Sequence, residues 1–250
     1  ERGSKTTSDS YVLWPARIGP FTLVMGRHYK NMDTSSLPFS YLIESNDESI
    51  LVPAINLRSV GTIRDAQKWP QRDRRKDPDK IDQVNFNLLS PYTIRKMFEG
   101  RDLLRRLRSV SGTVSSLYTF NNMRITGPSL EKGIDLYQTG INKFLGNSII
   151  KRLEKTEFVS NEELRKRLVA DETAGNDEWV DLAGLIAPKK EVDRLLDDIE
   201  SGKVNDLETV SEAFRTMHNS YYKWEWSWAK ERIESEMGKP VTSFTSADIT

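Results

Sequence analysis

The sequence predicts an α+β protein in which a short N-terminal β region, residues 1–56, precedes a mainly α-helical domain, residues 57–250. Apolar runs of strand length, separated by Gly, Pro and Asn–Asp, extend to Val52 and indicate β structure. Helical periodicity with capping residues begins at Ser90–Pro91 and recurs as far as Gly238. A chain of 250 residues can form one large domain or two small ones, each with its own core.

The predicted strands are short, and glycines such as Gly19 and Gly26 mark tight corners between them. A β-helix built from six-residue repeats would show an aliphatic residue followed by glycine in each unit. Ile18–Gly19 and Val60–Gly61 fit that pattern only in isolation, so the residues alone give such a repeat little support. The runs of strand length are Tyr11–Trp14, Phe21–Met25, Phe39–Ile43 and Ile50–Val52.

The helical part is marked by its start and stop signals. Proline at a first helical position opens helices at Pro91 and Pro128. The segment from Gly112 to Thr126 is ambiguous, and Trp179–Leu182 is a short strand or a turn. Further helices are expected from the capping box at Ser160–Glu163, over Lys189–Ile199, and from the capping box of Asn205 and Glu208 to Met237.

Composition excludes several classes of function. The 37 basic residues balance the 37 acidic ones, so no global field holds a nucleic acid or an anionic membrane. There is no cysteine, and the two histidines are far apart in sequence, so a zinc site would need carboxylate ligands. No run of 18 apolar residues indicates a membrane span, which makes the cytoplasm the default compartment.

A basic segment runs from Arg58 to Lys80, with eight cationic and four acidic residues. If Leu57–Trp69 is helical, with Pro70 limiting the helix, its cations recur every fourth residue on one face. The alternative is a solvated, self-paired surface, which is common for alternating Arg and Asp. The anion-binding candidates are Arg64, Lys68, Arg72, Arg74 and Arg75, and the acid–base candidates beside them are Asp65 and Asp73.

Aromatic residues cluster in the last predicted helix. Tyr221, Trp224 and Trp228 share one helical face, whereas Tyr222 and Trp226 point elsewhere. Aromatic residues on several faces favour burial against the rest of the chain or a partner subunit. The alternative is a stacking surface for a sugar or base, for which the candidate rings are Trp69, Tyr222 and Trp226.

Several segments together resemble an uncharacterised bacterial family of Bacteroidetes or spirochaete type. Its members are longer proteins with an N-terminal left-handed β-helix of hexapeptide repeats, often labelled sugar-phosphate nucleotidyltransferases or acyltransferases. The resemblance spans nearly the whole chain. It is carried by Trp14–Pro15, Leu37–Ser40, Leu51–Ala54, the Arg64–Asp65 to Arg75 segment, Phe86–Pro91, Trp179–Lys189 and His218–Trp226.

This resemblance implies that the β region is the end of, or an extension to, a left-handed β-helix, in a homo-oligomer. It implies a transferase acting on a phosphorylated or nucleotide-activated sugar, with His28 as a possible catalytic base. An ordinary hydrogen-bonded histidine is the alternative there. The chain shows no Gly-rich nucleotide-binding loop, and the sequence does not indicate which cofactor, if any, it binds. Its start at Glu1 suggests the middle of a longer polypeptide. A non-catalytic structural or oligomerisation module, packing on a β-helix, is the competing hypothesis.

Overall fold

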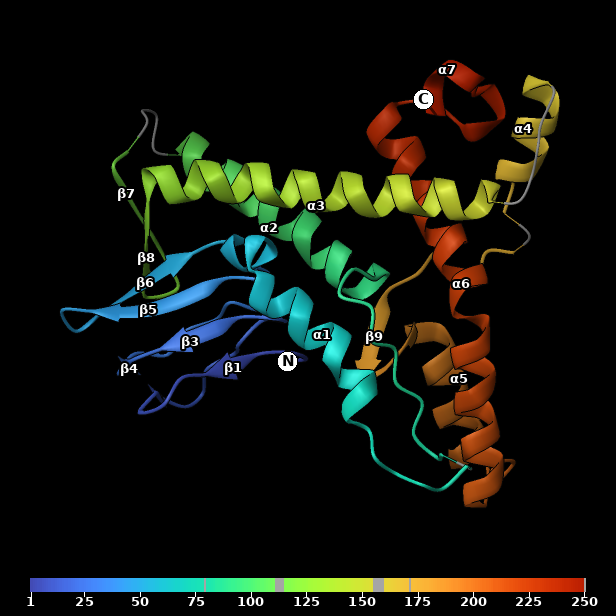
Figure 1. The fold of residues 1–250 in the computed structure, drawn as a ribbon, viewed down its shortest axis with the longest axis horizontal. Helices are drawn as coiled ribbons and strands as arrows, with labels where there is room; N and C mark the ends of the chain where they lie inside the picture. The colour runs from blue at the N-terminus through green and yellow to red at the C-terminus, as the bar shows by residue number, and fades with distance from the viewer. Residues whose placement is uncertain (79, 111–114, 155–159, 171, 250) are drawn as a thin grey trace. The chain divides into compact units, whose positions relative to one another are not determined.

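The computed structural model describes residues 1–78, 80–110, 115–154, 160–170 and 172–249. It confirms the α+β class, because a short N-terminal sheet is followed by a mainly helical region (Figure 1). The chain forms two compact units. Unit 1 comprises residues 1–73 and 93–142, and unit 2 comprises residues 74–92 and 143–250.

Unit 1 contains a sheet in the order β1-β3-β5-β6-β8-β7. Its centre is an antiparallel hairpin of β5 and β6, whose turn residues Asn46 and Asp47 have φ values of 51° and 60°. Two left-handed residues are what a tight type I′ hairpin turn requires, and Asn and Asp tolerate them well. The strands are β1 Lys5–Thr6, β3 Leu23–Met25, β5 Tyr41–Ser45, β6 Glu48–Val52, β7 Leu117–Phe120 and β8 Met123–Thr126.

The first 43 residues wind as stacked three-sided coils. On one side, β1, β3 and β5 pair in parallel, with Lys5 opposite Leu23 and Leu23 opposite Tyr41. On the second side, β2 (Tyr11–Val12) pairs in parallel with β4 (Arg27–His28), and on the third a parallel bridge joins Arg17 to Asp33. The chain therefore returns to the same side after 16 to 18 residues.

The helices of unit 1 follow the hairpin. A 3₁₀ turn, η1 (Ile55–Arg58), leads into α1 (Val60–Arg72), and α2 (Pro91–Val110) begins at the predicted proline. The prediction that Pro70 limits α1 is wrong, because the helix continues to Arg72. Proline removes one hydrogen bond there, and only a short end of the helix follows it. The ambiguous segment forms the β7–β8 hairpin, although residues 111–114 lie outside the described residues.

Helix α3 (Gly127–Leu153) contributes residues to both units. In unit 1 its buried Tyr137 donates a 2.8 Å hydrogen bond from its hydroxyl to the Pro38 carbonyl. Leu42, Leu51, Ile94 and Met97 are fully buried beside this part of the core. The sheet and the first helices of the chain thus share one core in unit 1.

Unit 2 is mainly helical and holds one antiparallel hairpin, β9 (Trp179–Leu182) with β10 (Leu185–Pro188). Ser160 caps α4 as predicted, by accepting a hydrogen bond from the Glu163 amide. Asp206, and not the predicted Asn205, caps α6, because its carboxylate accepts from the Thr209 amide. The helices are α4 Asn161–Leu168, α5 Lys189–Glu200, α6 Leu207–Met237, η2 Val241–Ser243 and α7 Ser246–Ile249.

Among the described residues, no helix has the combined length and apolar character that crossing a bilayer requires.

Candidate functional site

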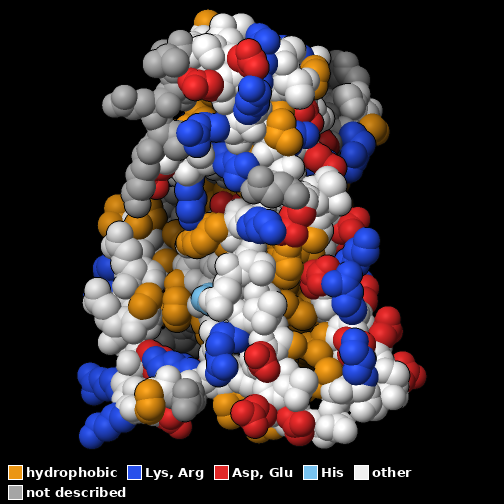
Figure 2. All heavy atoms as spheres, turned by 90° about the vertical axis from the view of Figure 1, so that its right-hand side faces the viewer, with side chains coloured by type: hydrophobic (Ala, Val, Ile, Leu, Met, Phe, Trp, Pro, Cys, Tyr) orange, Lys and Arg blue, Asp and Glu red, His pale blue; other side chains and the backbone are white. Residues whose placement is uncertain are grey.

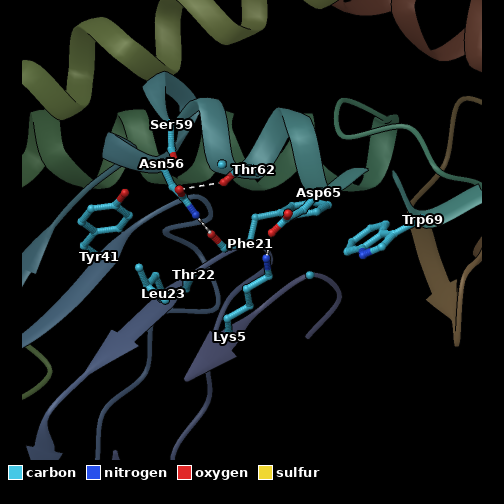
Figure 3. A pocket seen from close by; sticks show the side chains of 12 residues that line it. Lys5, Phe21, Thr22, Leu23, Tyr41, Asn56, Ser59, Thr62, Asp65 and Trp69 are labelled. Atoms are coloured by element: carbon cyan, nitrogen blue, oxygen red, sulfur yellow. Dashed lines mark hydrogen bonds and ion pairs between the residues drawn. The ribbon is translucent and has the colours of Figure 1, made fainter. Parts of the chain in front are cut away.

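A pocket of about 120 Å³ lies in unit 1, between the parallel strands β1, β3 and β5 and the segment from η1 to α1 (Figure 3). Strands form its floor, and the helix covers it. Its lining residues are Gly3, Lys5, Phe21, Thr22, Leu23, Tyr41, Asn56, Ser59, Gly61, Thr62, Asp65 and Trp69.

The floor is a single row of paired residues. Lys5, Leu23 and Tyr41 face one another across the three parallel strands, so their side chains leave the same face of the sheet. The next residues along β3 and β5, Val24 and Leu42, are buried on the opposite face. The alternation of side chains along each strand therefore directs the row of Lys5, Leu23 and Tyr41 towards α1.

The cover is one face of α1. Thr62, Asp65 and Trp69 line the pocket, and their three- and four-residue spacing places them on the same side of the helix. Asp65 and Trp69 were predicted as site residues, and the structure brings them together here. The predicted cations Arg64, Lys68 and Arg72 are exposed, and none of them lines the pocket.

Asn56 joins the cover to the floor. Its side-chain amide donates a 2.6 Å hydrogen bond to the Phe21 carbonyl, and its side-chain oxygen accepts a 2.7 Å hydrogen bond from the Thr62 hydroxyl (Figure 3). Asn56 is buried, so both ends of its amide are satisfied inside the protein. This pair of bonds fixes η1 and the start of α1 over the strands.

An ion pair between Lys5 and Asp65 connects β1 to α1 beside the pocket (Figure 3). The second oxygen of Asp65 lies 3.4 Å from Nη2 of Arg64. The Trp69 ring stacks on Phe21 with centroids 6.1 Å apart, and Phe21 stacks in turn on Phe39 at 4.7 Å. The Asp65 carboxylate and the Trp69 ring therefore both attach α1 to the N-terminal β region.

Two hydroxyls at the pocket, those of Tyr41 and Ser59, have no hydrogen-bond partner among the described residues. Thr22 also lines the pocket, but its Oγ1 is buried without a hydrogen-bond partner and is out of reach of a ligand there. Sequence reasoning missed the hydroxyl residues of this pocket, because the row of Lys5, Leu23 and Tyr41 shares no residue type that would reveal its 18-residue spacing.

His28, predicted as a possible catalytic base, lies in the interior and does not line the pocket. Its Nδ1 is 2.8 Å from the Ser49 hydroxyl, and its Nε2 is 3.2 Å from the Met25 carbonyl. Burial lowers the pKa of the imidazole, which favours the neutral ring. These contacts support the alternative prediction of an ordinary hydrogen-bonded histidine.

The remaining predicted charges do not gather at the pocket. Asp73 is the residue that ends α1, and Arg74 and Arg75 belong to unit 2, where Arg75 pairs with Asp82. On the face shown in Figure 2, Lys and Arg side chains of the described residues are interspersed with Asp and Glu. Among the described residues, no group of three or more His, Asp and Glu side chains is placed to hold a metal ion.

The predicted stacking rings of unit 2 behave differently from each other. Trp226 is 5% exposed, and the Arg152 guanidinium lies 5.7 Å from its ring centre, so this candidate stacking ring is buried. Tyr221, Trp224 and Trp228 are buried as well, which confirms the packing interpretation of the aromatic cluster. Tyr222 is half exposed and carries the Lys151 ammonium over its ring.

Two family models match the chain, each over less than half of its length. Residues 1–108 are similar to a domain of unknown function, DUF4954, and residues 160–250 are similar to a second one, DUF6819. Neither a curated protein nor a solved structure matches the chain. The matched regions assign no chemistry to the pocket, so the geometry alone has to support a function.

Proposed function

We propose that the chain is a non-catalytic structural module that terminates a three-sided parallel β-solenoid. The observation that carries the proposal is the change of strand direction within one sheet. Parallel pairing of β1, β3 and β5 at 18-residue spacing gives way to the antiparallel β5–β6 hairpin. The resemblance to left-handed β-helix proteins supports the same role.

One end of the coil stack is closed. A further parallel coil would have to pair with the free edge of β5, and that edge is occupied by β6. β6 pairs in turn with β8, and β8 with β7, so the sheet continues with strands from a distant part of the sequence. Covering a strand edge in this way is how proteins prevent further strand addition.

At the other end of the stack, β1 is an edge strand of the sheet formed by the described residues. The Lys5 amide donates to Thr22 and the Thr7 amide to Val24, so the intervening Thr6 amide points away from β3, on the edge side of β1. On the second side, the amides of Tyr11 and Leu13 donate to the second coil, and the Val12 amide between them points away from it. Such an edge pairs readily with another strand.

The spacing of the open coil specifies its partner. Lys5, Tyr11, Arg17 and Leu23 occupy successive sides, six residues apart. A preceding coil with the same six-residue spacing would place a parallel strand beside β1 and another beside β2. We therefore infer a hexapeptide-type β-solenoid as the partner of this edge.

A fusion experiment tests this function. The 250-residue chain is joined to a three-sided parallel β-solenoid of known structure, in the register that continues the six-residue spacing. We expect the amides of Thr6 and Val12 to gain at least about tenfold protection from hydrogen exchange. A fusion shifted by three residues is the control. Equal exchange of both amides in the two fusions would contradict the proposal.

A second candidate function, a transferase region acting on a phosphorylated or nucleotide-activated sugar in a homo-oligomer, draws support from Asp65 and Trp69 at the pocket. It requires the predicted cations to bind phosphate. A rise in Tm with sugar phosphates, nucleotide sugars or acyl-CoA, lost in Arg72→Ala and Arg74→Ala, would favour it. The absence of any rise would count against it.

A further inference from the structure

We propose that the pocket under α1 binds a neutral polyhydroxylated molecule of monosaccharide or polyol type. The proposal does not depend on the structural role of the coil edge, because the pocket lies within unit 1 and is complete there. It rests on the number of hydroxyls around the pocket, on the direction of their hydrogen bonds, on the pairing of the charges, and on the size of the space.

Two side chains of the pocket present only hydrogen-bond acceptors, so the ligand has to supply donors. The hydroxyl hydrogen of Thr62 is already donated to Asn56, so Thr62 presents only lone pairs to a ligand. The Asp65 carboxylate can only accept as well. A ligand that meets both must donate hydrogens, as sugar and polyol hydroxyls do.

The pocket also offers hydroxyls of its own that can donate or accept. Tyr41 and Ser59 have no side-chain hydrogen bond within the described residues, and Figure 3 shows the Tyr41 hydroxyl pointing towards the η1–α1 side. A ligand hydroxyl at hydrogen-bond distance would give Tyr41 or Ser59 a partner that the described residues do not supply.

The charges favour a neutral ligand over a phosphorylated one. Lys5 and Asp65 are the two charged residues in the pocket lining, and they form an ion pair with each other. Arg64 provides a second cation at 3.4 Å from Asp65, so the carboxylate is balanced. A phosphate would have to break the Lys5–Asp65 pair to gain a cation, whereas a hydroxyl can share the carboxylate without breaking it.

The size and the apolar surfaces suit a small polyhydroxylated ligand. A volume of about 120 Å³ accommodates roughly four water-sized groups at about 30 Å³ each, so the pocket holds part of a monosaccharide ring or a small polyol. Leu23 forms an apolar floor, while Tyr41 and Trp69 stand at opposite ends of the pocket in Figure 3. Aromatic and aliphatic surfaces of this kind pack against the C–H faces of a sugar.

Binding is tested on the full chain with a defined panel of probes. Glucose, galactose, mannose, N-acetylglucosamine, myo-inositol and sorbitol are compared with glucose 1-phosphate and inorganic phosphate, by ligand-observed NMR and calorimetric titration. We expect at least one neutral probe to saturate with a Kd of about 1 mM or tighter. Tyr41→Phe should weaken that Kd about five- to tenfold, because it removes one hydroxyl that has no internal partner.

Two further variants make the result decisive. Ser59→Ala should also weaken binding, and Tyr11→Phe, which changes an exposed tyrosine outside the pocket, should leave the Kd unchanged. Circular dichroism confirms that each variant is folded. The proposal is overturned if no neutral probe saturates, if Tyr41→Phe binds as tightly as the native chain, or if phosphate-bearing probes bind more tightly than their neutral counterparts.

Discussion

Glu225, a buried carboxyl of unit 2, gives a prediction at the scale of one residue. It is 7% exposed on α6, and burial raises its pKa, while Tyr221 and the charge of Lys151 oppose the shift. The folded protein then holds this proton more tightly than the unfolded chain does. The contribution of Glu225 to stability is therefore full below its ordinary pKa of 4.5 and is lost as the pH rises through the folded pKa.

Glu225→Gln removes this ionisation and keeps the shape of the side chain. We expect the variant to have a larger free energy of unfolding than the native chain at about pH 8 and an equal one at about pH 4. The gain is about 1.4 kcal/mol for each unit by which burial raises the pKa. Urea unfolding at both pH values measures it. Glu212→Gln, on an exposed position of the same helix, is the control and should show no such gain.

Two helix-interior glycines make a prediction at the scale of elements. A Cβ added at Gly100 in α2 would lie 2.6 Å from the Ser36 carbonyl oxygen and 2.9 Å from the Tyr137 ring. Gly100→Ala should therefore destabilise the protein by about 1–3 kcal/mol, because backbone cannot move aside cheaply. A Cβ at Gly146 in α3 would meet nothing within 4 Å, so Gly146→Ala should stabilise by roughly 0.5–1 kcal/mol.

Urea unfolding midpoints of the two alanine variants test the difference in sign. Both glycines lie within helices, so helix propensity alone predicts stabilisation at each site. If Gly100→Ala stabilises as much as Gly146→Ala, the close approach of α2 to Ser36 and Tyr137 is not present in solution.

Elements were predictable from the sequence where their determinants are local. Pro91 and the Ser160 capping box mark helix starts through neighbouring residues, so both were predicted correctly. Asn205 was predicted because Glu208 completes a capping box with it, whereas the structure uses the neighbouring Asp206 as the cap. The residues alone gave the parallel coils little support, because their strands pair at long range and the row of Lys5, Leu23 and Tyr41 shares no residue type, so only the resemblance implied a β-helix.

At the scale of the whole molecule, the sequence predicted some residues of the candidate site and missed others. The spacing on α1 identified a face of cations, but the helix has several faces, and spacing alone does not say which one meets the strands. Asp65 and Trp69 turned out to line the pocket, whereas Arg64, Lys68 and Arg72 are exposed. The hydroxyls of Tyr41 and Ser59 became visible only once the pairing of the strands was known.

The charge of the chain gives a last prediction at this scale. Its formal net charge is zero at pH 7, with a sequence pI of about 7.1, so little electrostatic repulsion opposes association there. The exposed edge of β1 provides a surface through which two copies of the chain can associate. We expect light scattering to show the strongest self-association near pH 7, and several-fold less at about pH 5 and about pH 9.

A pair of lysine variants separates the strand edge from net charge. Thr6→Lys places a charge on β1, and Ser8→Lys adds the same charge outside the strand. Lysine on an edge strand blocks pairing with another strand, so Thr6→Lys should reduce association at pH 7 much more than Ser8→Lys. Equal effects of the two variants would mean that net charge alone controls association and that the β1 edge is not the contact surface.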